Sequence, residues 1–219
     1  MDTIQNFYTN PEKDNNYLNK YHDEHKNRIQ WVIKRFGLDK LENKRILDIG
    51  CGRGDYFKYL NSNNTFVGID GAIIGNDKKL VPFLNIRTNI NNEFAYLLDN
   101  EERFDVVICS ETLEHCTDIY RILDEIKKLL VSDGLFLITI PSVEMQHNYI
   151  YPALMANPNN WEQFLEQMSF NIIDADKFKD GWPSNCWLCR NKSYYFSNMM
   201  FHKSEDKFRG KSPLEQVNI

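Results

Sequence analysis

The chain has 219 residues, of which 42% are hydrophobic, 13% aromatic and 26% charged. These shares exclude a disordered or collagen-like chain, and the length allows one domain with a sizeable core. The formal net charge of -5 excludes a general basic surface of the kind that binds nucleic acid or anionic lipid.

Cysteine usage and hydropathy favour a cytoplasmic protein. The five cysteines are few and unevenly spaced, which argues against a disulfide framework and suits a reducing compartment. Residues 1–19 are polar and lack the apolar stretch of a signal peptide. The longest apolar runs, residues 106–109 and 135–138, are far shorter than the roughly 20 residues that cross a bilayer. We therefore expect no membrane and no nucleic-acid partner.

Short apolar runs alternate with helical patterns along most of the chain. Apolar side chains at helical spacing begin near residue 17 and stop at Gly37. Further on, the pattern predicts strands at residues 44–49, 65–70, 83–86, 104–109 and 135–140, and helices at 56–60 and 118–130. Strands that are apolar on both faces and separated by helices indicate a mostly parallel sheet covered on both sides. Right-handed crossovers make this fold a doubly wound α/β sandwich.

The later part of the chain follows a looser pattern. Two further strands are expected at residues 170–178 and 192–202. We expect one domain in four parts: an N-terminal helical cap (1–43), a ligand-binding α/β core (44–142), a substrate-facing insertion with Trp161 and Phe164 (143–168), and a strand pair with a polar tail (169–219).

A glycine loop follows the first predicted strand, with the sequence Gly50-Cys51-Gly52-Arg53-Gly54. Glycines permit positive φ and close backbone approach, and a helix N-terminus offers free N–H groups. Asp70 ends the second strand, 22 residues after Asp48, at the sheet edge where open α/β sheets bind ligands. This position suits a carboxylate that accepts hydrogen bonds from two ribose hydroxyls. The pattern therefore predicts a ligand that contains a nucleoside.

The loop differs from the dinucleotide fingerprint G-x-G-x-x-G, because its third glycine comes one residue early. Asp48 places a carboxylate near the loop, where it would repel a diphosphate and attract a cationic ligand. S-adenosylmethionine carries an ammonium and a sulfonium, so the charges favour it. A dinucleotide oxidoreductase remains an alternative.

Four segments lie in order within residues 44–142: ILDIGCGRG (46–54), GID (68–70), FDVVICSETLEH (104–115) and DGLF (133–136). Together they resemble the class I S-adenosylmethionine-dependent methyltransferases, in the small-molecule branch that includes ubiquinone-biosynthesis and sugar O-methyltransferases. The resemblance implies a seven-stranded sheet whose last strand runs antiparallel. It also implies S-adenosylmethionine as the cofactor and S-adenosylhomocysteine as its product.

The same resemblance implies a set of cofactor-binding residues, namely Asp48, Gly50, Cys51, Gly52, Gly54, Asp70, Gly71, Asn89, Ile90, Ser110 and Glu111. Asp48 and the glycine loop would hold the methionine amino end, and Asp70 the ribose. Asn89 and Ile90 lie where the family usually has an aspartate near the adenine amino group. Ser110 and Glu111 would line the floor beside the sulfonium.

His115 is the candidate general base, six residues after the fourth predicted strand. A hydroxyl acceptor must lose a proton during methyl transfer, and an imidazole titrates near neutral pH. In a competing interpretation, the imidazole only hydrogen-bonds its loop or caps the helix beginning near Asp118. His147, which follows the fifth predicted strand, is the second candidate for catalysis or substrate contact.

Two other features have less specific interpretations. Cys186 and Cys189 form a C-x-x-C without a second pair or paired histidines, so we expect incidental thiols and no metal site. The N-terminal aromatic residues either cap the cofactor or pack the first helix onto the sheet; they are Phe7, Tyr8, Tyr17, Tyr21 and His22.

We predict O-methylation of a small polar acceptor, such as a sugar, a nucleotide-sugar or a surface-polysaccharide precursor, including phosphorylated or phosphoramidate-type ones. The insertion at residues 143–168 is aromatic without a long apolar run, which suits a saccharide better than a quinone. The alternatives are an N-methyltransferase on an amino sugar or other metabolite, and a non-catalytic S-adenosylmethionine-binding regulatory subunit. The sequence leaves open whether the chain forms a homodimer.

Overall fold

The computed structural model describes residues 15–52, 54–71, 84–88, 90, 92, 103–142, 157–181 and 183–191. In chain order, its helices and strands are α2 (Asn15–Arg35), η1 (Leu38–Lys40), β1 (Arg45–Ile49), η2 (Tyr56–Lys58), β2 (Thr65–Asp70), β3 (Leu84–Arg87), β4 (Phe104–Ser110), η4 (Leu113–His115), α3 (Ile119–Leu129), β5 (Leu130–Pro141), α5 (Pro158–Gln167), β6 (Phe170–Phe178) and β7 (Ser184–Asn191).

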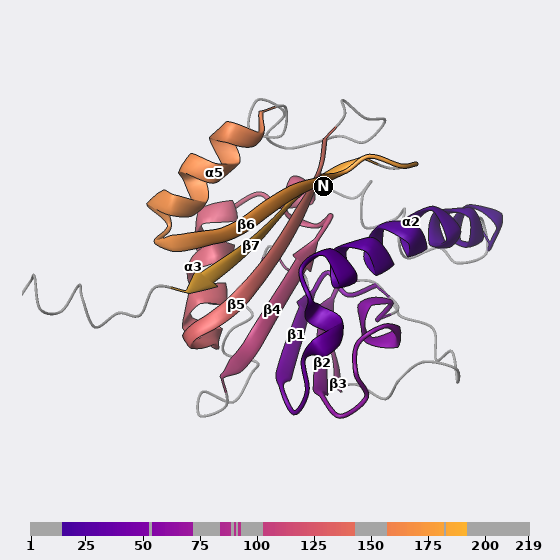
Figure 1. The fold of residues 1–219 in the computed structure, drawn as a ribbon, viewed down its shortest axis with the longest axis horizontal. Coiled ribbons are helices and arrows are strands. Elements are labelled where there is room, and N and C mark those ends of the chain that lie inside the picture. The colour runs from indigo at the N-terminus through magenta and orange to yellow at the C-terminus, as the bar shows by residue number, and fades with distance from the viewer. Residues whose placement is uncertain are drawn as a thin grey trace, which may run out of the picture.

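The strands form one seven-stranded sheet in the order β3-β2-β1-β4-β5-β7-β6 (Figure 1). Strands β1 to β5 pair in parallel, and β7 runs antiparallel between β5 and β6. The strand order reverses at β1, which has β2 on one side and β4 on the other. Ligands of open α/β sheets bind at this reversal, beyond the carboxyl ends of the strands. The predicted doubly wound, mostly parallel fold with an antiparallel last strand is confirmed.

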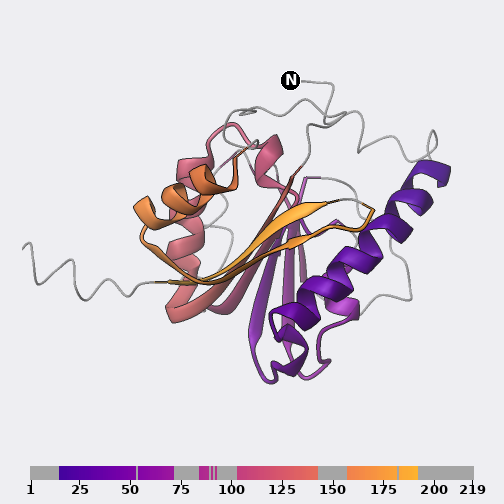
Figure 2. The ribbon, with the colours of Figure 1, turned by 45° about the horizontal axis from the view of Figure 1, so that its top comes forward.

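Helices cover both faces of the sheet, with α2 on one face and α3 and α5 on the other (Figure 2). The core on the α2 side includes Val32 and Ile33, which pack with the short helix η2. The core on the other side includes Ile122 of α3 and Trp161 of α5, both fully buried. Burying one such apolar side chain is worth about 1.5–3 kcal/mol. The two helical layers therefore stabilise the sheet whose strand ends carry the glycine loop.

The N-terminal start of α3 follows from its sequence. Asp118 precedes the helix, and its side chain accepts a hydrogen bond from the Arg121 N–H at 3.0 Å. A capping carboxylate of this kind satisfies one of the free N–H groups of the first turn. The helix predicted at residues 118–130 is therefore confirmed as α3.

Two sequence predictions about the fold are wrong, and a third is not tested. The glycine loop leads into the single 3-10 turn η2 rather than an α-helix. The partner of β6 is β7 at Ser184–Asn191, whereas the strand expected at 192–202 falls outside the described residues. Trp161 and Phe164 belong to the core instead of facing a substrate, with exposed fractions of 0% and 6%.

The C-x-x-C motif lies on β7, where residues three apart point to opposite faces of the sheet. Cys186 accordingly packs on the α2 side and Cys189 on the α3 side. Their sulfurs therefore cannot share an ion or form a disulfide with each other.

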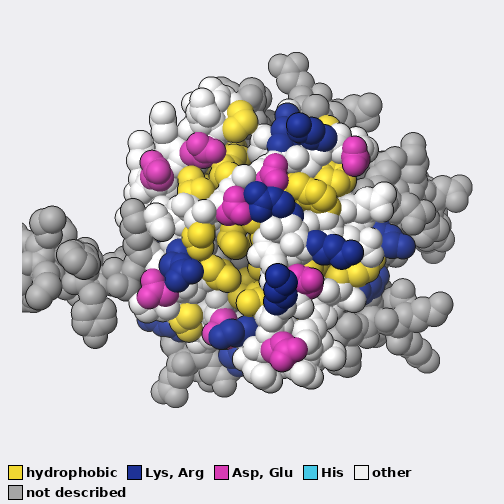
Figure 3. All heavy atoms as spheres, in the orientation of Figure 1, with side chains coloured by type: hydrophobic (Ala, Val, Ile, Leu, Met, Phe, Trp, Pro, Cys, Tyr) yellow, Lys and Arg dark blue, Asp and Glu magenta, His cyan; other side chains and the backbone are white. Residues whose placement is uncertain are grey.

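The described surface carries charges of both signs. On the face in Figure 3, Lys and Arg side chains are interspersed with Asp and Glu. Among the described residues, no helix has the length and hydropathy needed to cross a membrane.

Candidate active site

The glycine loop occupies the carboxyl end of β1. Gly50, Gly52 and Gly54 all have positive φ, at 76°, 50° and 74°. The loop is held to β2 by the N–H groups of Gly50 and Cys51, which donate to the Ile69 carbonyl at 2.8 and 3.2 Å. A Cβ on Gly50 would lie 2.1 Å from the Thr112 Oγ1, so this position has no room for a side chain. All three glycines allow the positive φ, and Gly50 is also required for close approach.

Asp70 lies at the carboxyl end of β2, beside the same loop, and is half-buried. Its Oδ2 accepts a hydrogen bond from the Gly52 N–H at 2.9 Å. Asp70 therefore fixes the middle of the glycine loop in addition to presenting a carboxylate there.

Asp48 is buried in β1, with an exposed fraction of 2%. Burial raises the pKa of this carboxyl well above its usual range, and the charges of Asp70 and Asp55 raise it further. Asp55 itself pairs with Lys58 at 2.6 Å. A cationic group bound beside the loop would relieve the repulsion between Asp48 and Asp70. The residues present thus fit the ammonium end of a donor such as S-adenosylmethionine.

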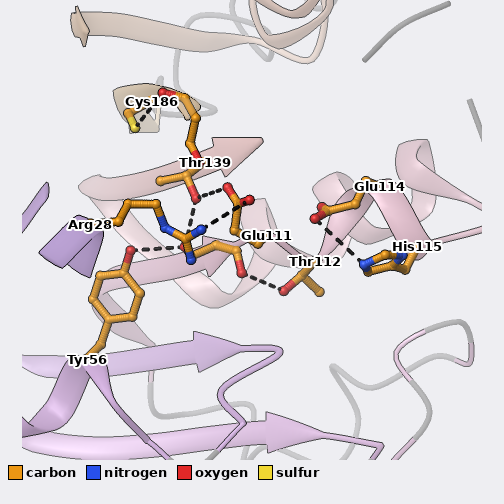
Figure 4. Close-up of polar contacts among 10 residues, drawn as sticks. Arg28, Tyr56, Glu111, Thr112, Glu114, His115, Thr139 and Cys186 are labelled. Atoms are coloured by element: carbon orange, nitrogen blue, oxygen red, sulfur yellow. Dashed lines mark hydrogen bonds and ion pairs between the residues drawn. The ribbon is translucent and has the colours of Figure 1, made fainter. Parts of the chain in front are cut away.

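A second polar group lies at the carboxyl ends of β4 and β5 (Figure 4). The Tyr56 hydroxyl donates to the Ser110 Oγ at 3.0 Å, and Ser110 and Thr139 share a hydrogen bond at 2.7 Å. Thr139 in turn contacts the Glu111 Oε1 at 2.9 Å. Burial raises the pKa of Tyr56, so the phenol stays a donor. Ser110 and Glu111 are therefore joined in one network.

Glu111 also forms a buried ion pair that sequence reasoning missed. The Arg28 Nη1 of α2 lies 3.2 Å from the Glu111 Oε2, and the two side chains are 4% and 5% exposed. Arg28 stands four residues before Val32 and eight before Phe36, on the buried stripe of the helix. A charged residue on an apolar stripe was the available signal.

His115 and Glu114 lie on η4, in the loop after β4. The His115 Nε2 is 3.8 Å from the Glu114 Oε1, and the imidazole is 22% exposed (Figure 4). Glu114 is 1% exposed, and its Oε2 has no hydrogen-bond partner among the described residues. Burial, and then the charge of Glu111, raise the pKa of this carboxyl well above its usual range. The two side chains form a close acid–base pair that the sequence did not predict.

The other predicted site residues are less informative. Gly71 follows β2 directly, and Ile90 packs against the core while its carbonyl accepts a hydrogen bond from Arg121 at 2.9 Å. His147 and Asn89 lie outside the described residues.

The strand order, the glycine loop and the two carboxylates at β1 and β2 define a class I methyltransferase fold. A family described as "Methyltransferase domain" matches residues 21–181, and the chain belongs to this family. The resemblance stated from the four sequence segments is confirmed.

The curated relatives of the chain include two ubiquinone biosynthesis O-methyltransferases. One, from Glaesserella parasuis, is 30% identical over 146 residues, or 58% of this chain and 61% of that protein. The other, from Pelagibacter ubique, is 28% identical over 166 residues, or 67% of this chain and 66% of that protein. The chain therefore spans less than two thirds of the length of these relatives.

Solved structures share the fold. A magnesium protoporphyrin IX methyltransferase from Synechocystis PCC 6803, with bound SAM, superposes with a TM-score of 0.63 at 13% identity, covering 87% of this chain and 95% of that one. A SAM dependent methyltransferase from Aquifex aeolicus gives a TM-score of 0.59 at 18% identity, covering 74% and 89%.

Proposed function

We propose that the chain is an S-adenosylmethionine-dependent methyltransferase that methylates a hydroxyl oxygen of a small polar acceptor. The observation that carries this proposal is the pair of neighbouring carboxylates, Asp48 and Asp70, beside a glycine loop with open space at Gly52. The donor brings an activated methyl group on a positively charged sulfur. Asp48 and the loop backbone would hold its ammonium end, and Asp70 its ribose hydroxyls.

The proposed base is His115, with Glu114 beside it. A partly exposed imidazole can take the acceptor proton, and the Glu114 carboxyl lies close by, with its Oε1 3.8 Å from the His115 Nε2. Most of the remaining catalysis comes from holding the acceptor in line with the methyl group, which is worth roughly 7–11 kcal/mol in well-oriented systems. His147 stays the second candidate for this role.

The acceptor atom and the acceptor class rest on different grounds. The relatives named as O-methyltransferases support oxygen over nitrogen as the atom methylated. The proposed acceptor is a sugar, a nucleotide-sugar or a surface-polysaccharide precursor. Trp161 and Phe164 are buried and do not contribute to the case for a saccharide. A phenolic precursor of a quinone is the second candidate, and the names of the relatives favour it.

Two measurements test this proposal. Calorimetric titration with S-adenosylmethionine, S-adenosylhomocysteine and NAD should show binding of the first two only. Incubation with methyl-labelled donor should then transfer label to one member of a panel of sugars, sugar nucleotides, amino sugars and catechols. Label on a catechol would select the second candidate acceptor, and label on an amine would replace O- by N-methylation. Donor binding without transfer to any acceptor would favour the regulatory alternative, and binding of NAD alone would overturn the methyltransferase proposal.

A further inference from the structure

The ion pair between Arg28 and Glu111 connects helix α2 to the end of β4. Its 3.2 Å separation lies in the interior, since neither side chain is more than 5% exposed. Seven residues further along the same helix, Arg35 pairs with Asp174 and Asp176 of β6 at 2.6 and 2.5 Å. That second cluster is half-exposed, with side chains between 33% and 41% exposed. One helix thus carries two carboxylate contacts of similar chemistry in different surroundings.

Glu111 has a backbone conformation that needs support. Its φ is 50°, in the left-handed region that non-glycine residues seldom adopt. Its N–H donates to the Thr139 carbonyl at 3.0 Å, and its Oε1 accepts from the Thr139 hydroxyl at 2.9 Å. Arg28 contacts the other carboxylate oxygen. β5 and α2 therefore hold the residue from two sides, and this support stabilises the sharp exit of the chain from β4.

The chain segment that starts at Glu111 contacts the glycine loop and also carries the candidate base His115. The hydroxyl of the next residue, Thr112, lies within hydrogen-bond distance of the Ser110 carbonyl at 3.0 Å and of the Ile49 carbonyl at 3.3 Å, and it occupies the space beside Gly50. His115 follows three residues later, and its N–H donates to the Thr112 carbonyl at 3.1 Å. A shift of Glu111 would consequently displace the contact with the glycine loop and the candidate base together.

We propose that Arg28 is a positioning residue: through its buried ion pair it fixes the loop 111–115 against the glycine loop, so that α2 sets the geometry of the site. The importance of this loop for donor binding rests on the proposed function. A stabilising role alone explains the pair poorly, because a buried ion pair contributes little net stability compared with neutral groups of similar size. Loss of one partner is nevertheless destabilising, since it leaves the other charge buried.

The test separates positioning from stability with single and double variants of the full chain. Arg28→Met should lower the free energy of unfolding, and the double variant Arg28→Met/Glu111→Gln should recover it. Hydrogen exchange followed by mass spectrometry should still show at least tenfold faster exchange across residues 111–116 in the double variant. The affinity for S-adenosylhomocysteine, measured by calorimetry, should fall about tenfold in Arg28→Met, which leaves Glu111 in place. Arg35→Met is the matched control on the same helix. It should change neither the exchange rate of residues 111–116 nor the affinity for S-adenosylhomocysteine.

Four results would overturn the proposal. The first is loop protection that returns with stability in the double variant, and the second is equally fast loop exchange in Arg35→Met. The third is unchanged affinity in Arg28→Met when the wild type binds, and the fourth is failure of the double variant to fold. The last would make the pair a stability element. The exchange measurement needs no ligand, so a wild type that binds no S-adenosylhomocysteine would refute the proposed function separately.

Discussion

At the carboxyl ends of the parallel strands, the carboxylates beside β1 and β2 and the carboxylate beside β4 differ in whether the chain supplies a positive partner. On the β1–β2 side, Asp48 and Asp70 repel each other, and every influence on the Asp48 pKa raises it. On the β4 side, Glu111 is balanced within the chain by Arg28. The difference suggests that the first side is completed by a cationic ligand, whereas the second is already neutral and can receive an uncharged acceptor.

The largest expected effect is the loss of turnover when the candidate base His115, which would contact the methyl acceptor, is replaced. His115→Gln should lower turnover about 10²–10⁴-fold, because the acceptor would lose its proton without a positioned base. Affinity for S-adenosylhomocysteine should stay within about twofold of wild type, since the imidazole lies on the neutral side of the edge. Initial rates with labelled donor and calorimetry check both quantities. The exposed helix residue Tyr120 provides a control in Tyr120→Phe. Full activity in His115→Gln would move the base role, with His147→Gln as the next variant.

Asp70 tests the donor side. Asp70→Ala should weaken S-adenosylhomocysteine binding at least about 100-fold, because each of the two hydrogen bonds from the ribose to the charged carboxylate is worth roughly 1.5–3 kcal/mol. Asp70→Asn keeps an oxygen that can accept from the Gly52 N–H, so it separates loop support from the ribose contact. Calorimetry on both variants measures these losses. Equal affinity in Asp70→Ala and wild type would refute the assignment of this carboxylate.

Replacing Asp48 should give the smallest of these effects, a pH-dependent change in the free energy of unfolding that tests the electrostatic explanation directly. Its folded-state pKa is raised, so its contribution to stability is greatest below the unfolded pKa near 3.9 and is lost as the pH rises through the folded value. Asp48→Asn should therefore raise the free energy of unfolding at pH 7–8, because the neutral amide avoids the cost of ionising a buried carboxyl. The gain should shrink as the pH falls toward 4, and donor affinity should drop about tenfold.

Urea unfolding at several pH values checks the stability change, and calorimetry checks the affinity. Asp105→Asn is the matched control, because Asp105 accepts hydrogen bonds from the Arg45 N–H and Lys44 Nζ at the opposite end of β4. That variant should show no gain in stability. A pH-independent gain in Asp48→Asn would contradict the electrostatic explanation.

The sequence predicted the parallel core closely because β1, β2 and β4 are buried on both faces for most of their length. The strand expected at residues 104–109, for example, is β4 at Phe104–Ser110. The glycine loop and Asp70 were predictable because their spacing along the chain reflects one local strand–loop unit. Strand β7 was not predicted, because polar residues at both ends, Ser184, Asn185, Arg190 and Asn191, hide a run that is buried on both faces.

The ion pair of Arg28 could not be predicted in the same way. Its two partners belong to segments far apart in the sequence, and only the packing of α2 across the sheet brings them together. The pairing of Glu114 with His115 was hidden for another reason. Adjacent residues on a strand or helix usually point apart, so their order in the chain did not indicate the 3.8 Å approach of the His115 Nε2 to the Glu114 Oε1.

All five thiols of the chain are free and buried, and they are distributed over its layers. Burial raises the pKa of Cys116, Cys186 and Cys189 to about 12, which keeps them unreactive toward alkylating reagents near neutral pH. Cys51 stands within the glycine loop, and burial raises its pKa as well. Maleimide labelling of the native protein would consequently report transient opening, cysteine by cysteine, without an introduced probe. A ligand that closes over the loop would slow the modification of Cys51 in particular.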